Sequence, residues 1–164
     1  MVIDINPNFS KNLQVVAVGA RNLDKAKEFA TKFEIPKAYG SYSDLAKDPD
    51  IDVIYVGSVC FTHLDVCKML LNHNKHVLCE KPLAMDVKES EEILHLAKEK
   101  GTFFMEAIWS RTLPAYLKLK KELKSGSIGK VFSLNSDFSV KFEGFAAERV
   151  AKKTFDINDT MIYW

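Results

Sequence analysis

Val77-Leu78-Cys79-Glu80-Lys81-Pro82 is the stretch that decides the fold of this 164-residue chain. An apolar run leads directly into a charged pair, and a proline follows. A short continuous apolar run of this kind is typical of a strand that is buried on both faces of a parallel sheet. Ligands of open α/β sheets bind outside the carboxyl ends of the strands. The stretch therefore predicts both a parallel sheet and an edge of that sheet that carries chemistry.

Similar apolar runs recur along the chain, with helical patterns between them. We expect further strands at 15–18, 53–56 and 103–105, and we interpret Tyr39-Gly40-Ser41 as a turn. Apolar residues recur at helical spacing over 23–33, 41–46, 62–71, 86–100 and 114–123. This alternation of strand and helix predicts an α/β fold with a doubly wound parallel sheet.

The pattern changes after Gly129. Residues 131–142 alternate apolar and polar side chains, which is typical of a strand with one face in solvent. We therefore place a domain transition near Ser127–Lys130. The prediction is a partial dinucleotide-binding domain over residues 1–128 and the beginning of an α+β domain over residues 129–164.

Composition excludes several classes of protein. Lys and Arg number 23 against 22 Asp and Glu, so the net charge of +1 gives no basic surface for nucleic acid or an anionic membrane. No apolar run approaches the roughly 20 residues that span a bilayer, and the first ten residues do not look like a secretory signal. The three cysteines lack the spacing of a zinc site. We expect no metal, and a cytoplasmic location.

Two strand ends offer candidate cofactor contacts. Arg21 follows the first expected strand, and no acidic residue appears before Asp24. A basic residue there suits the 2′-phosphate of NADP, whereas the alternative is a surface arginine paired with Asp24. Gly57 would let a cofactor approach the backbone, and His63 begins a helix whose free N–H groups attract phosphate. The alternative for His63 is an ordinary polar surface residue.

The other two strand ends offer candidate catalytic and substrate groups. Lys81 could act as an acid or base, because lysine shifts its pKa readily when it is partly buried, and the Lys81–Pro82 bond could be cis. The alternative is that Glu80 and Lys81 only neutralise each other. Trp109 and Arg111 could line a pocket for a small polyol or aromatic ring. The alternative is a core tryptophan and a surface arginine.

Taken in order, these segments resemble the glucose–fructose oxidoreductase and inositol dehydrogenase family. The resemblance is carried by Cys79-Glu80-Lys81-Pro82 and by the segment 104–111 about twenty residues later. The stretches 15–21, 35–42, 45–49 and 54–57 are similar to one NADP-linked branch of that family, which acts on dihydrodiols and D-xylose. The resemblance extends from roughly Val15 to Val140.

The resemblance implies an NADP-dependent oxidoreductase that transfers hydride between the nicotinamide and a CH–OH group of a small diol or sugar. It implies that full-length relatives form homodimers. It assigns catalytic roles to Lys81, Asp159 and Tyr163, and substrate contacts to Trp109 and Arg111. The cofactor contacts that it implies are Arg21, Tyr55, Gly57, His63, Glu80, Lys81, Pro82 and Ala107.

The chain also departs from the family pattern. No glycine precedes Gly19, so the family's first strand, its glycine-rich turn and the following helix have no counterpart. We therefore expect a chain truncated at both ends, a sheet that lacks its central strand, and no pyrophosphate site. Asp159 and Tyr163 keep their mutual spacing but lack the neighbouring glycines. Three interpretations stay open: such a dehydrogenase, an inactive fragment or interaction module on a partial Rossmann scaffold, and another nucleotide-binding α/β domain.

Overall fold

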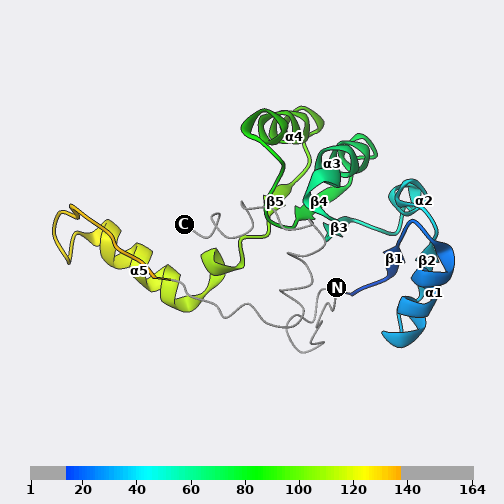
Figure 1. Ribbon diagram of the computed structural model, residues 1–164, viewed down its shortest axis with the longest axis horizontal. Helices are drawn as coiled ribbons and strands as arrows, with labels where there is room; N and C mark the ends of the chain where they lie inside the picture. Colours follow the sequence, from blue (N-terminus) through cyan, green and yellow to red (C-terminus); the bar gives the residue numbers. More distant parts are fainter. Residues whose placement is uncertain (1–13, 138–164) are drawn as a thin grey trace. The chain divides into compact units, whose positions relative to one another are not determined.

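A computed structural model describes residues 14–137, which fall into two compact units divided between Glu106 and Ala107 (Figure 1). The elements of the first unit are β1 (Ala17–Gly19), α1 (Leu23–Lys32), β2 (Lys37–Tyr39), α2 (Tyr42–Lys47), β3 (Val53–Val56), η1 (Cys60–Thr62), α3 (His63–Asn72), β4 (His76–Cys79), α4 (Val87–Lys100) and β5 (Phe104–Glu106). The second unit contains the 3₁₀ turn η2 (Trp109–Thr112) and α5 (Pro114–Ser125).

The first unit contains two parallel sheets. β1 pairs with β2, and β3, β4 and β5 form a second sheet in that order. The doubly wound fold has the strand order 3-2-1-4-5-6. The two sheets match positions 3-2 and 4-5-6 of that order, so the break between β1 and β3 lies where strand 1 would lie. Within residues 14–137, no strand occupies that position.

The interpretation of residues 39–41 as a turn was wrong at its start, because Tyr39 belongs to β2. The Lys37 N–H donates to the Val16 carbonyl at 3.1 Å, and the Ala20 N–H donates to the Tyr39 carbonyl at 3.0 Å. The sequence Lys-Ala-Tyr has no β-branched residue, so its strand conformation comes from pairing with β1 rather than from local preference. The expected strand at 15–18 is likewise found two residues later, at Ala17–Gly19.

Helix boundaries agree with the sequence because the capping residues act locally. Asn22, Ser41 and Asp86 each precede a helix, and each side chain accepts a hydrogen bond from a backbone N–H in the first turn. Gly101 ends α4 with φ +66°, a left-handed conformation that favours glycine. These caps fix where α4 begins, which is immediately after the Glu80-Lys81-Pro82 segment.

The core lies around the three-stranded sheet. α3 packs against β3, β4 and α4, and Figure 1 shows these two helices beside β4 and β5. Side chains with almost no exposed surface come from α3, β4 and α4: Cys67, Leu70, Leu71, Val77, Cys79 and Ile93. Burial of this apolar surface is the main stabilising contribution in the first unit.

A buried lysine and Asp48 together link β2 to the segments that precede β3 and β4. Lys75 is 8% exposed, and its Nζ donates to the carbonyls of Asp48 at 2.6 Å and Ile51 at 2.8 Å. The Asp48 carboxylate accepts from Lys37 Nζ at 2.9 Å and from the Tyr39 hydroxyl at 2.7 Å. These two hydrogen bonds lower the pKa of Asp48 to about 2. Polar contacts therefore tie β2 to the segment that leads into β4.

The second unit is described by α5 and its flanking turns. α5 begins at Pro114, ends at Ser125 with Gly126 as its C-cap, and buries none of its residues. The expected strand at 131–142 was wrong over 131–137, where the chain is exposed and forms no strand. No described segment pairs with these residues, and a strand depends on such a partner. Residues 138–142, Asp159 and Tyr163 lie outside the described residues, and a domain start at 129 stays a prediction.

Within residues 14–137, no helix combines the length and the apolar character needed to cross a bilayer.

Candidate active site

The Glu80-Lys81-Pro82 segment forms a tight turn at the carboxyl end of β4. The Glu80 N–H donates to the Val56 carbonyl at 2.8 Å, so strand pairing with β3 continues up to the turn. The Lys81–Pro82 peptide bond is cis, as the sequence suggested, and Pro82 is fully buried. Lys81 itself is half-buried. The turn therefore places the lysine at the sheet edge where ligands of such folds bind.

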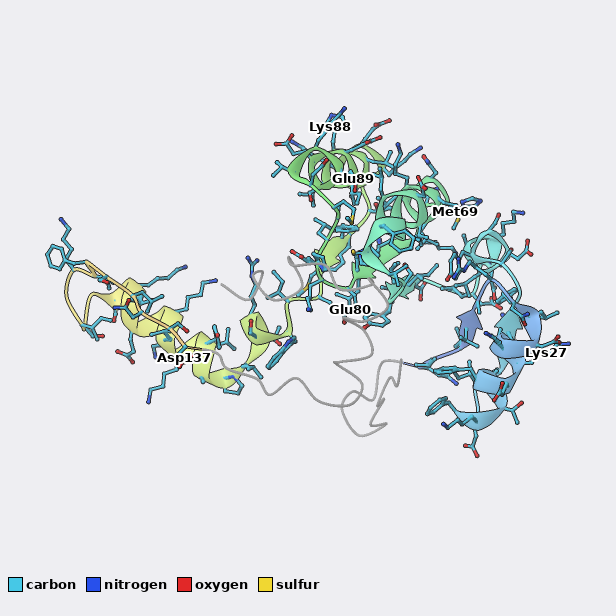
Figure 2. All side chains as sticks on the ribbon, in the orientation of Figure 1. Lys27, Met69, Glu80, Lys88, Glu89 and Asp137 are labelled. Carbon is cyan, nitrogen blue, oxygen red and sulfur yellow. The ribbon has the colours of Figure 1, made fainter. Side chains whose placement is uncertain are left out.

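Glu80, labelled in Figure 2, binds the backbone of the turn and a tyrosine of the neighbouring strand, Tyr55. The Tyr55 hydroxyl donates to Glu80 Oε1 at 2.5 Å, and the Lys81 N–H donates to Oε2 at 3.2 Å. Burial raises the pKa of the Tyr55 phenol, and the hydrogen bond to Glu80 raises it further. Tyr55 therefore stays a protonated donor at neutral pH, and both oxygens of the Glu80 carboxylate accept a hydrogen bond.

Glu106 is a residue of this site that the sequence analysis did not select. It ends β5, where it pairs in register with Cys79. Its Oε1 accepts the Leu83 N–H at 2.9 Å, so a carboxylate from a third strand holds the far side of the turn. The rule that ligands bind at carboxyl strand ends could have identified Glu106, because it directly follows Phe104 and Met105.

His63 lies beneath the turn and is 1% exposed. Its Nδ1 lies 2.9 Å from the Pro82 carbonyl oxygen, and its Nε2 lies 3.0 Å from the Ser58 carbonyl oxygen. His63 is therefore not the polar surface residue of the alternative interpretation. Its predicted contact with a cofactor stays a prediction, and the described hydrogen-bond contacts of the ring all go to backbone carbonyls.

Arg21 and Gly57 follow the two strands that border the break in the sheet. Arg21 is exposed after β1 and forms no hydrogen bond or ion pair with another residue of 14–137. The alternative pairing with Asp24 is therefore not formed. Gly57 is half-buried directly after β3. An exposed, unpaired guanidinium can bind a phosphate group through two parallel hydrogen bonds.

Ala107, Trp109 and Arg111 belong to the second unit. Trp109 is 53% exposed, so the alternative in which it is a core residue was wrong. Arg111 is exposed in η2, and the buried residues of this segment are Ile108 and Ser110. The predicted roles of Ala107 at the cofactor, and of Trp109 and Arg111 at the substrate, stay predictions.

The cysteines do not form a metal site within the described range. Over residues 14–137, no three or more His, Cys, Asp or Glu side chains come together in a way that could hold a metal ion. A hydrogen bond with Cys67 and burial raise the pKa of the Cys79 thiol. Cys79 therefore stays a neutral thiol beneath the turn, where it contributes to packing.

Comparison with known protein families identifies the fold. Residues 5–108 match the model of the GFO/IDH/MocA oxidoreductase family, which is described as having an NAD-binding Rossmann fold. The chain belongs to this family. The two described sheets are thus parts of a Rossmann-type α/β fold.

Individual relatives are similar over most of this chain but over less than half of their own length. Trans-1,2-dihydrobenzene-1,2-diol dehydrogenase from Xenopus tropicalis is 50% identical over 128 residues, which are 78% of this chain and 39% of that protein. The mouse (Mus musculus) protein of the same name is 43% identical over 145 residues, 88% of this chain and 42% of that protein. The chain thus spans about two fifths of the length of these curated relatives.

Among solved structures, a levoglucosan dehydrogenase in complex with NADH and levoglucosan matches with a TM-score of 0.66 and 29% identity, over 70% of this chain and 31% of that one.

Proposed function

We propose that this chain carries the lysine and the adenosine-side cofactor contacts of an NADP-dependent dehydrogenase. The reaction is reversible hydride transfer between NADP and a CH–OH carbon of a small diol or sugar. Trans-1,2-dihydrobenzene-1,2-diol and D-xylose are the first substrates to test. The observation that carries the proposal is Lys81, which lies at the carboxyl end of β4 in a turn bound by carboxylates from β4 and β5. Family membership supports the reaction class.

The residues present fit NADP in part. In a Rossmann fold the residue after the second strand faces the adenosine ribose, and a basic residue there suits a 2′-phosphate. β1 matches that strand, and the exposed, unpaired Arg21 supports NADP over NAD. Tyr55, Gly57, Pro82 and Ala107 are proposed for the rest of the cofactor. No residue of this chain is proposed for the pyrophosphate, because no glycine precedes Gly19.

Lys81 performs the acid–base part of the proposed mechanism. The bound nicotinamide supplies the acceptor or donor of the hydride. In oxidation, Lys81 Nζ binds the substrate hydroxyl oxygen and accepts its proton, and in reduction it returns that proton to the carbonyl oxygen. Glu80 and Glu106 hold the backbone of the turn, so the Nζ atom is presented from a fixed segment. Trp109 and Arg111 are proposed to contact the substrate.

Three broader predictions belong to the same proposal. The partner is a small molecule rather than a nucleic acid or a membrane, the full-length relatives are homodimers, and the location is cytoplasmic. The near-neutral charge balance of 23 basic and 22 acidic residues supports the first.

The proposal is tested by following NADPH formation with each of the two substrates. We expect turnover with NADP, and a loss of about 100-fold or more in Lys81→Met, because an acid–base group typically contributes that much. Lys88→Met is the matched control, since Lys88 is an exposed lysine in the first turn of α4 (Figure 2). If neither substrate is turned over, this chain does not have the proposed activity. If Lys81→Met keeps full activity, Lys81 does not have the proposed acid–base role.

A further inference from the structure

His63 joins two loops that follow neighbouring strands. Its Nδ1 lies 2.9 Å from the Pro82 carbonyl oxygen and 3.2 Å from that of Leu83, in the turn after β4. Its Nε2 lies 3.0 Å from the carbonyl oxygen of Ser58, in the loop after β3. The ring is buried, and a buried polar group of this kind is costly unless it is hydrogen-bonded.

The N–H groups and the carbonyl groups of the turn have different side chains as their hydrogen-bond partners. The N–H groups of Lys81 and Leu83 donate to the carboxylates of Glu80 and Glu106. The carbonyls of Pro82 and Leu83 face the imidazole of His63. Pro82 has no N–H group. Without the imidazole, the carbonyls of Pro82 and Leu83 lose their described partner. The carboxylates alone then hold the turn, so its N–H groups should open to solvent more often.

The Ser58 loop depends less on His63 than the turn does. The Thr62 hydroxyl lies 2.8 Å from Ser58 Oγ and 2.8 Å from the Val59 carbonyl oxygen. These contacts close the loop without the imidazole. Loss of His63 therefore affects the turn that carries Lys81 more than it affects the loop after β3.

We propose that His63 is a positioning residue for Lys81. Through Nδ1 it holds the carbonyls of Pro82 and Leu83, and so fixes the backbone from which the Lys81 side chain extends. The proposal places an N–H group on Nδ1, where it donates to the turn. The inference rests on the proposed function, because the position of Lys81 matters to catalysis only if Lys81 takes part in the reaction.

Two amide substitutions test the contact of Nδ1 and the contact of Nε2 separately. In His63→Asn the side-chain amide nitrogen reaches the position of Nδ1 and can still donate to the turn. In His63→Gln it reaches the position of Nε2 and donates to Ser58 instead. Both variants place one amide in the same buried site, so each controls for the other. His63→Leu removes both contacts and keeps an apolar side chain there.

The readout is amide hydrogen exchange at Leu83, measured in the whole chain. Loss of one hydrogen bond corresponds to roughly a three- to tenfold change in an opening equilibrium. We expect Leu83 to exchange faster by about that factor in His63→Gln and His63→Leu. His63→Asn should stay near the wild-type rate. The Glu80 amide, which donates to Val56, is the internal control and should not change. Equal rates in the Asn and Gln variants would overturn the proposal.

A measurement on the wild-type chain keeps the proposal testable if the variants do not fold. Long-range ¹H–¹⁵N NMR correlations identify which ring nitrogen of His63 carries hydrogen. Hydrogen on Nδ1 supports the proposal, and hydrogen on Nε2 alone overturns it. Neither experiment uses NADP or a substrate. A chain without turnover that shows the expected exchange pattern would therefore contradict the proposed function but not the fixing of the turn by His63.

Discussion

The two sheets of the first unit differ in burial and in sequence, because β1 and β2 are Ala-Val-Gly and Lys-Ala-Tyr whereas β3 is Val-Ile-Tyr-Val. In the three-stranded sheet, Ile54, Val56, Val77 and Cys79 are buried. In the two-stranded sheet, every residue of β1 and β2 is only half-buried. The middle strand β4 has a neighbour on each side, and α3 packs against this sheet. The apolar residues of β3 and β4 are buried where neighbouring strands and α3 cover them, whereas β5, at the edge of the same sheet, is half-buried throughout. A two-stranded sheet has little stability of its own.

The largest test of this comparison is a matched pair of core truncations. Leu71→Ala, beneath the three-stranded sheet, should lower the free energy of unfolding by about 2–5 kcal/mol, because it leaves a cavity in a fully buried site. Val18→Ala in β1 should cost less than about 1 kcal/mol, because Val18 is half-buried. Urea unfolding followed by circular dichroism measures both. Equal costs would show that the two sheets are equally well packed.

The next test concerns the carboxyl end of the two-stranded sheet. Arg21→Ser should weaken binding of 2′-AMP by about tenfold, because it removes the cation proposed for the 2′-phosphate. Binding of 5′-AMP should change little, which makes it the control ligand. NMR titration of the chain with each nucleotide measures the affinities. An equal loss for both ligands would mean that Arg21 does not distinguish the 2′-phosphate.

A smaller effect is expected at the helix that leads into β5. Gly101→Ala should lower the free energy of unfolding by about 1 kcal/mol, because alanine is strained at φ +66°. A methyl group there would meet no atom within 4 Å, so the cost comes from the backbone alone. Gly126→Ala has the same backbone geometry at the end of α5, which buries none of its residues. A thermal melt that falls in Gly126→Ala but not in Gly101→Ala would contradict a backbone cost at Gly101.

The smallest effect is a pH dependence at Asp48, whose carboxylate binds two residues of β2. The ordinary pKa of 3.8 for Asp48 falls to about 2, so its carboxylate stabilises the folded chain at neutral pH. That contribution is complete above about pH 4 and disappears as the pH falls through about 2. Asp48→Asn should lower the melting temperature at pH 7, and its curve should converge with the wild-type curve in acid. Asp50→Asn is the control, because the exposed Asp50 also binds Lys37. A constant difference down to pH 2 would contradict the assignment.

Local signals in the sequence predicted much of the fold. Asn22, Asp86 and Gly101 mark helix ends because capping depends on a few neighbouring residues. The run 53–56 predicted β3 because four consecutive apolar or aromatic residues need a covered strand. The Lys81 turn was found because the change from apolar to charged residues occurs within the motif itself.

Contacts between distant segments account for what the sequence did not predict. β2 exists because β1 pairs with it, and Lys-Ala-Tyr carries no strong strand preference of its own. Glu106 follows the apolar residues of β5, but its contact with the turn depends on β5 lying in register beside β4. The alternation over 131–137 forms no strand, because periodicity alone does not supply a partner. The buried position of His63 likewise depends on two loops that meet in the fold.

The chemical reactivity of Lys75 can be used to follow whether its surroundings are folded. Its ammonium group is enclosed by the Asp48 and Ile51 carbonyls, whereas lysines such as Lys27 and Lys88 are exposed (Figure 2). Amine acylation and tryptic cleavage both need access to the lysine side chain. Lys75 should therefore resist both while its contacts with these carbonyls are intact, and should become reactive when they are lost. A mass spectrum of partly labelled chain thus records, at one residue, whether this part of the chain is folded.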